Sequence, residues 1–169
     1  MTAAAHESQG IRATADTEKG IVRVVAEIKA SPERVFRALT SPDEVPKWWG
    51  ERGVYKTAKW ESDLRPGGKW KSTIAAPEGG EMYDPRTPEP QTVGGEYIVV
   101  DPPHLLEFTW SPSWDGFAVS RVRYEIEQTE TGSRLTVIHT GFEGWTEMAA
   151  SHGEGWVRVL GWLSAHAAG

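Results

Sequence analysis

The sequence contains no cysteine, which excludes disulfide frameworks, thiol nucleophiles and cysteine-ligated metal sites. It also lacks an excess of positive charge, because 18 Lys and Arg against 24 Asp and Glu give a net charge of -6 at pH 7. The chain therefore has no general attraction for nucleic acids or anionic membrane surfaces. No apolar run approaches the roughly 18 residues of a membrane span, and no signal-peptide pattern begins the sequence. We expect a cytoplasmic protein that binds neither nucleic acid nor membrane.

The short motifs of several enzyme classes are also missing. There is no G-x-S-x-G elbow, no G-x-x-x-x-G-K-[ST] loop, no G-x-G-x-x-G after a strand and no H-E-x-x-H helix. The histidines show no metal-ligand spacing; they are His6, His104, His139, His152 and His166. The motifs therefore predict no catalytic residue, no metal site and no cofactor.

Tryptophan, in contrast, is abundant, with nine in 169 residues. The length suits a single domain, and ordinary cores do not need this much indole. The rings either fill a large core or line a cavity for an apolar or aromatic ligand. A small ligand of this kind is the partner we expect, while a protein partner and a monomer or weak dimer are left open.

The hydrophobic pattern changes period along the chain. Residues 1–19 are polar with Ile11 as the one large aliphatic side chain, and we interpret them as a disordered or loosely attached tail. Residues 20–169 form the predicted single domain. Alternation predicts strands at 21–29, 55–61, 69–75, 95–100, 105–111, 117–128 and 133–140. A helical stripe predicts a long helix over 151–168, which must pack against the sheet.

Helix-start signals lie at three places. Ser31 precedes a proline and is a candidate N-cap for a short helix. Ser41 with Glu44, and Ser151 with Glu154, fit the capping-box spacing for a second short helix and for the long one. Residues 76–94 contain four prolines and lack any period, so they are predicted to form a loop, either a lid over a ligand or disordered.

This order of elements resembles the helix-grip fold of the START-related SRPBCC superfamily. The similarity narrows to bacterial proteins related to the activator of heat-shock protein 90 ATPase. The motifs that carry it are Ala30 to Phe36, Trp48-Trp49, Arg65 to Trp70, Asp101 to Trp110, His139 to Phe142 and Gly155-Trp156. The resemblance implies an α+β fold in which a curved antiparallel sheet of about seven strands wraps around the long C-terminal helix, with two short helices after the first strand.

The same resemblance implies a cavity between the sheet and the long helix. Strand parity and the helical stripe place Trp70, Phe108, Trp110, Tyr124, His139, Trp156 and Leu160 on its inner faces. With Trp48 and Trp49, which belong to the motifs of the resemblance, these are the candidate ligand-binding residues. For each ring the alternative is plain core packing. The leading hypothesis is binding of a small apolar or aromatic molecule.

Two alternatives from other classes stay open. One is a cyclase-like or aromatase-like enzyme in which His139 or Tyr124 acts as acid or base. The other is a co-chaperone-like interaction domain, which needs an exposed docking patch. His139 occupies the same alternating positions as the apolar residues of its strand. The alternative to a functional role is a buried structural histidine whose hydrogen bonds are satisfied.

Overall fold

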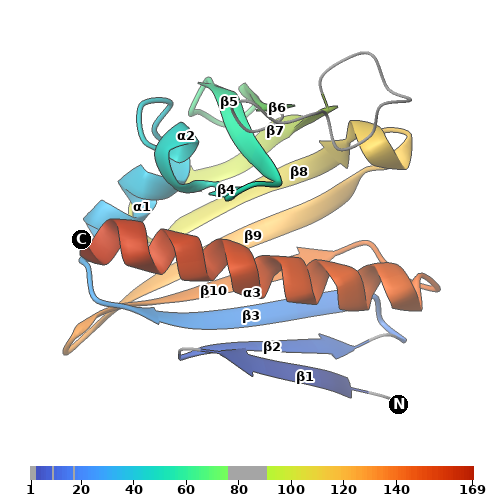
Figure 1. The fold of residues 1–169 in the computed structure, drawn as a ribbon, viewed down its shortest axis with the longest axis horizontal. Coiled ribbons are helices and arrows are strands. Elements are labelled where there is room, and N and C mark those ends of the chain that lie inside the picture. Colours follow the sequence, from blue (N-terminus) through green and yellow to red (C-terminus); the bar gives the residue numbers. More distant parts are fainter. Residues whose placement is uncertain (1–2, 9, 17, 76–90) are drawn as a thin grey trace.

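The computed structural model describes residues 3–8, 10–16, 18–75 and 91–169. These residues form one antiparallel sheet in the order β1-β2-β3-β10-β9-β8-β7-β6-β5-β4, with the long helix α3 lying across one face (Figure 1). The strands are β1 (Ala3–Ser8), β2 (Ile11–Asp16), β3 (Ile21–Ile28), β4 (Gly50–Glu51), β5 (Tyr55–Ser62), β6 (Lys69–Ala75), β7 (Gln91–Asp101), β8 (Leu105–Pro112), β9 (Ser120–Thr129) and β10 (Gly132–Thr140). The helices are α1 (Pro32–Thr40), α2 (Val45–Trp48), the 3-10 turn η1 (Ser113–Asp115) and α3 (Thr146–Ala168). The predicted helix-grip fold is confirmed, with ten strands in place of about seven.

The core lies between α3 and the facing side of the sheet. Val22, Val24 and Ala26 of β3 alternate with exposed or half-exposed neighbours and have no exposed surface. Leu160 and Leu163 of α3 are equally buried, and α3 contacts both β2 and β3. The alternation read from the sequence therefore identifies the face that meets the helix.

The N-terminal segment differs from the expectation of a loose tail. Strand β2 pairs with β3 in the register Ile11 to Ala26 and Ala13 to Val24, and β1 pairs in turn with β2. Ile11 is only 2% exposed, and a Cβ on Gly161 of α3 would lie 3.9 Å from its Cδ1. The pattern Ile11, Ala13, Ala15 does alternate, but alanine buries little apolar area and gives a weak strand signal. The prediction of a disordered tail is therefore wrong for the described residues of this segment.

The three helix starts have different outcomes. Ser31 caps α1 as predicted, since its hydroxyl accepts a hydrogen bond from the Arg34 amide. Ser41 instead ends α1, and α2 begins at Val45. Helix α3 begins at Thr146, so Ser151 lies inside the helix and its predicted capping box is wrong. Of the predicted loop, residues 91–94 belong to β7, and the lid hypothesis for 76–90 lies outside the described residues.

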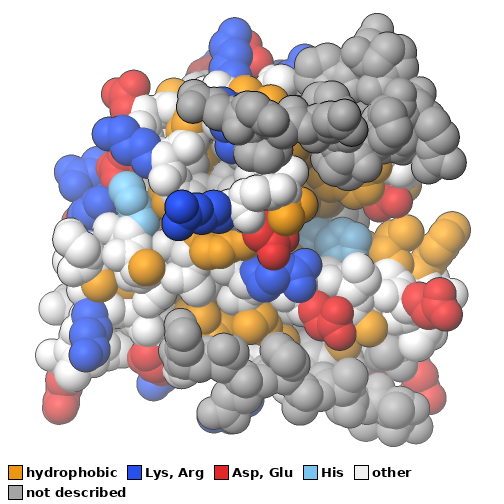
Figure 2. Space-filling view, in the orientation of Figure 1, with side chains coloured by type: hydrophobic (Ala, Val, Ile, Leu, Met, Phe, Trp, Pro, Cys, Tyr) orange, Lys and Arg blue, Asp and Glu red, His pale blue; other side chains and the backbone are white. Residues whose placement is uncertain are grey.

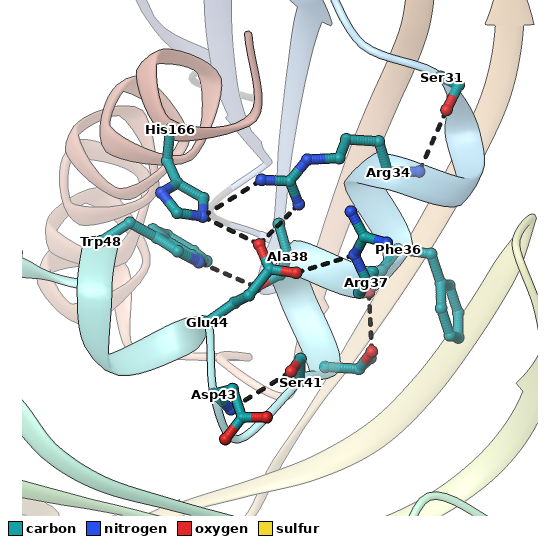
Figure 3. Close-up of polar contacts among 11 residues, drawn as sticks. Ser31, Arg34, Phe36, Arg37, Ala38, Ser41, Asp43, Glu44, Trp48 and His166 are labelled. Carbon is teal, nitrogen blue, oxygen red and sulfur yellow. Dashed lines mark hydrogen bonds and ion pairs between the residues drawn. The ribbon is translucent and has the colours of Figure 1, made fainter. Parts of the chain in front are cut away.

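One carboxylate joins the C-terminal end of α3 to both short helices (Figure 3). Glu44, just before α2, accepts hydrogen bonds from Arg34 Nη1 at 2.6 Å, Arg37 Nε at 2.9 Å and His166 Nε2 at 3.0 Å. Burial alone raises the pKa of Glu44, but the hydrogen bonds from His166 and the two arginines lower it below its ordinary value. The cluster fixes the last turns of α3 against the segment that carries Trp48 and Trp49.

Candidate functional site

A cavity of about 340 Å³ lies between the middle of α3 and the half of the sheet formed by β4 to β8. This volume is within the range of small-ligand pockets, roughly 300 to 1,000 Å³. Six of the nine indoles line it, namely Trp49, Trp60, Trp110, Trp114, Trp156 and Trp162. Val54, Ile74, Val93 and Val159 add aliphatic surface. The wall is therefore mainly apolar and aromatic.

Trp49 is the centre of the aromatic wall. It follows α2 directly, and the short helix ends there because the Trp49 amide bonds to the Val45 carbonyl. Its ring stacks at centroid distances of 6.2 Å on Trp60 and 6.3 Å on Trp110, and it meets Trp156 edge-on at 5.9 Å. Rings from the residue after α2 and from β5, β8 and α3 thus meet at one point, in the offset and edge geometries that aromatic pairs favour.

Most buried indole N–H groups bond to backbone carbonyls. Trp48 Nε1 donates to the Ala38 oxygen at 2.8 Å, Trp60 Nε1 to Thr40 at 3.3 Å and Trp70 Nε1 to Thr109 at 3.1 Å. Trp110 Nε1, in contrast, is buried without any partner among the described residues. The wall of the cavity therefore contains one buried donor without an acceptor. Such an unpaired donor costs about 1–3 kcal/mol of stability.

His139 takes part in a closed hydrogen-bond chain behind the cavity wall. Trp156 Nε1 donates to His139 Nδ1 at 3.1 Å, which makes Nδ1 the acceptor. In the neutral ring Nε2 then carries the hydrogen and donates to Ser120 Oγ at 2.6 Å, and that hydroxyl donates to the Trp110 carbonyl at 3.4 Å. With His139 neutral, every donor and acceptor in this series of hydrogen bonds has a partner.

The surroundings of His139 oppose a charge on its ring. Its side chain has no exposed surface, and burial, with a smaller effect from nearby His152, holds its pKa well below 6.5. A proton on Nδ1 would also point at the Trp156 N–H. His139 is therefore a neutral structural histidine, which matches the alternative left open for it.

The structure divides the nine predicted ligand-binding residues into two groups. Trp49, Trp110 and Trp156 line the cavity. The other six do not line it and are buried in the core; they are Trp48, Trp70, Phe108, Tyr124, His139 and Leu160. The alternation along the strands placed all of the strand residues correctly on the inner face of the sheet. Much of that face, however, is covered by packed rings and does not border the cavity.

Several cavity residues were missed. Trp60 lies on a predicted strand, but a register shift between Thr57 and Lys59 breaks the alternation that would have shown its face. His152 lies one helical turn before Trp156, and assigning it to a helix start concealed that spacing. Gly155 also lines the cavity, and a Cβ built there meets nothing within 4 Å.

The cavity mouth has an apolar border near the N-terminal end of α3. Trp114 of η1 and Trp145 line an adjoining hollow together with Ser151 and His152. Trp145 is 61% exposed, and Phe117 and Val119 are similarly exposed. Figure 2 shows hydrophobic side chains gathered at this end of the face. Glu51 and Arg158 are the charged residues of the lining.

The described ranges of the chain contain no group of three or more His, Asp or Glu side chains placed to hold a metal ion. They also contain no helix long and apolar enough to cross a membrane.

Solved structures with the same architecture come from several bacteria. A protein from Rhodobacter sphaeroides has a TM-score of 0.75 and 19% identity, with 92% of this chain and 96% of that chain covered. A protein from Arthrobacter aurescens has a TM-score of 0.73 and 20% identity, with coverages of 92% and 90%. An AHSA1-like protein from Aeromonas hydrophila has a TM-score of 0.70 and 20% identity, with coverages of 86% and 90%. At these identities the likeness concerns the fold.

The sequence itself gives the family. No curated protein matches the chain. The family model described as Activator of Hsp90 ATPase homolog 1-like protein matches residues 29–168, from the residue after β3 to the end of α3. The chain belongs to the Activator of Hsp90 ATPase homolog 1-like family.

Proposed function

We propose that the protein binds a small apolar or aromatic molecule in the cavity between α3 and strands β4 to β8. The observation that carries the proposal is the open volume of about 340 Å³ walled by six indoles. An aromatic ligand would stack on Trp49, Trp110 or Trp156 and remove apolar wall from water.

Gly155 offers a direct way to close the cavity without removing any wall contact. It faces the cavity, and a new Cβ meets nothing within 4 Å, so a leucine side chain has room there. Gly161 is the matched control on the same helix. It does not line the cavity, and a Cβ there makes an ordinary contact of 3.9 Å with Ile11.

The test uses 2-methoxynaphthalene, an uncharged aromatic probe whose two fused rings are slightly larger than an indole. We expect saturable quenching of tryptophan emission and a rise in melting temperature, because a ligand that binds only the folded state stabilises it. Gly155→Leu should abolish both effects while the variant remains folded. Gly161→Ala should keep both effects. Unchanged binding in Gly155→Leu, or a flat response of the wild type across a broad aromatic panel, would overturn the proposal.

The enzyme alternative has no observation in its favour. Tyr124 and His139 were its acid-base candidates, and neither lines the cavity. Burial, with a smaller effect from Tyr97, raises the pKa of Tyr124, which keeps its hydroxyl protonated. Burial also keeps His139 neutral.

A protein-interaction role is the second candidate, and one observation favours it. Trp114 and Trp145 are exposed and line the hollow that adjoins the cavity, and the exposed Phe117 and Val119 follow Trp114 closely in the sequence. Exposed apolar patches mark contact sites for partners. The family description suggests Hsp90 as the partner to test. We expect the wild type to change the ATPase rate of Hsp90 and the pair Phe117→Ser and Trp145→Ser to lose that effect; no change with the wild type would remove this candidate.

A further inference from the structure

His152 presents an open hydrogen-bond acceptor at the cavity. Its Nδ1 lies 2.9 Å from the Met148 carbonyl oxygen, one turn earlier in α3. A carbonyl oxygen only accepts, so Nδ1 must carry the hydrogen. In the neutral ring Nε2 is then an acceptor with a free lone pair.

The ring of His152 is held in a fixed orientation. It lies 4.6 Å from the Phe142 ring, and it meets the His139 ring edge-on at 5.1 Å. His139 is itself fixed by its bonds to Trp156 and Ser120. The direction of Nε2 is therefore set by packing and by the Met148 bond.

Nε2 of His152 also remains accessible. Across the described ranges no partner bonds to it, and the buried unpaired side-chain atoms are Trp110 Nε1 and Thr129 Oγ1, not this one. His152 lines both the cavity and the adjoining hollow, so its side chain lies where the two meet.

Charge at the cavity does not favour an ionic ligand. Glu51 and Arg158 contribute one negative and one positive side chain to the lining, and these cancel. The selectivity of the site must therefore come from shape and from neutral hydrogen bonds.

We propose that His152 Nε2 accepts a hydrogen bond from the ligand, so that the cavity prefers aromatic molecules that carry a hydroxyl donor, such as phenols, over their O-alkylated analogues. This inference rests on the proposed function, since it names the ligand class of that same cavity. The apolar rings hold the aromatic body, and His152 orients its hydroxyl group.

The test compares 2-naphthol with 2-methoxynaphthalene, which share a ring system and differ in the donor. Calorimetry at pH 8 measures both affinities. We expect the wild type to bind 2-naphthol roughly three- to tenfold more tightly, as one neutral hydrogen bond provides. His152→Phe should bind both probes equally, with the loss confined to 2-naphthol. His152→Gln, whose amide oxygen can accept, should restore part of the preference.

A second measurement does not depend on the folding of a variant. In the ¹⁵N-labelled wild type, the Nε2 resonance of His152 should shift with 2-naphthol and stay in place with 2-methoxynaphthalene. Equal binding of both probes by the wild type, with both lost in Gly155→Leu, would overturn the role of His152 and leave the cavity proposal standing. A preference for 2-naphthol that survives in His152→Phe would also overturn the role of His152 and leave the cavity proposal standing. If neither probe binds, the proposed function fails, and this inference fails with it.

Discussion

At the residue scale, Glu44 shows how one side chain can hold together elements from distant parts of the chain. Its carboxylate, 15% exposed, accepts from α1 through Arg34 and Arg37 and from α3 through His166. Charge-assisted bonds of this kind are stronger than neutral ones. Removal of the charge leaves three donors facing an amide.

We predict that Glu44→Gln lowers the free energy of unfolding by about 1–3 kcal/mol, the range of hydrogen bonds to charged groups. Urea denaturation at pH 7 measures the change. Glu61→Gln is the matched control, because Glu61 pairs with Lys59 on the exposed surface and such pairs contribute little. Equal effects of the two substitutions would contradict the role given to the cluster.

Trp156 supports a second prediction at this scale. The ring is 4% exposed, packs on Trp49 and Tyr124, and supplies the N–H that His139 accepts. Trp156→Ala should cost about 3–5 kcal/mol, as other large-to-small core changes do. Trp145→Ala, at the exposed start of α3, should leave the denaturation midpoint nearly unchanged. A small loss in Trp156→Ala would mean that the ring is not an essential part of the core.

The sequence could predict some of these residue roles and not others. The burial of Trp156 follows from its place in a helical stripe. The contact of Glu44 with His166 spans 122 positions, and no local period connects them. Glu44 also matched a capping box with Ser41, and that local interpretation competed with the tertiary one.

At the element scale, the first two strands form an edge of the sheet that α3 covers in part. Strand β2 gives β3 a hydrogen-bonded neighbour, and α3 contacts both β1 and β2. Without them β3 would be an exposed edge with unpaired backbone groups. The N-terminal segment is thus part of the folded domain.

We predict that Ile11→Ala lowers the free energy of unfolding by about 2–4 kcal/mol, since it empties a buried site against Gly161. Arg12→Ala, on the exposed face of the same strand, should have little effect. Thermal denaturation measures both. An unchanged melting temperature for Ile11→Ala would favour the loose tail that the sequence alone indicated.

Most elements could be predicted from local patterns. The hairpin strand Lys69–Ala75 has the predicted bounds, and β3 and β5 differ by one residue at the C-terminal end. The start of α3 was placed five residues late, because Ser151 and Glu154 imitate a cap inside a helix. Helix caps are read from single residues, and single residues carry less information than a period.

At the scale of the whole molecule, one buried and one half-buried titrating group shape the dependence of stability on pH. The pKa of His139 in the folded state lies below its ordinary 6.5, so the unfolded state binds more protons as the pH falls through that value. Stability therefore decreases below pH 6.5. Glu44 affects stability at lower pH. Its pKa in the folded state is depressed below 4.5, so its contribution to the free energy of unfolding is lost only as the pH falls below that value.

We predict a decline in the free energy of unfolding that begins near pH 6.5 and reaches at most about 1.4 kcal/mol per pH unit for the one proton on His139. Urea titrations at half-unit pH steps measure it. His139→Phe should remove this slope whatever its effect on absolute stability, whereas His104→Gln, at an exposed position, should keep it. A slope that persists in His139→Phe would assign the proton to another group.

The cavity could not be predicted with the same accuracy as the fold. Alternation tells which side of a strand faces inward, but it does not tell whether the space on that side is filled. Phe108 and Tyr124 met the same criteria as Trp110, yet they pack edge to face in the core, and only Trp110 reaches the cavity. The difference depends on where α3 crosses the sheet, which is a property of the assembled molecule.

The meeting of indoles around Trp49 has a spectroscopic consequence. Trp49, Trp60, Trp70, Trp110 and Trp156 form a continuous series of rings whose neighbouring centroids lie 5.1 to 6.3 Å apart. At such separations excitation passes between rings before it is emitted, so the light absorbed by one indole is released by another. The fluorescence of the five rings is therefore coupled by energy transfer. A molecule that contacts any one of them can quench the emission of all five.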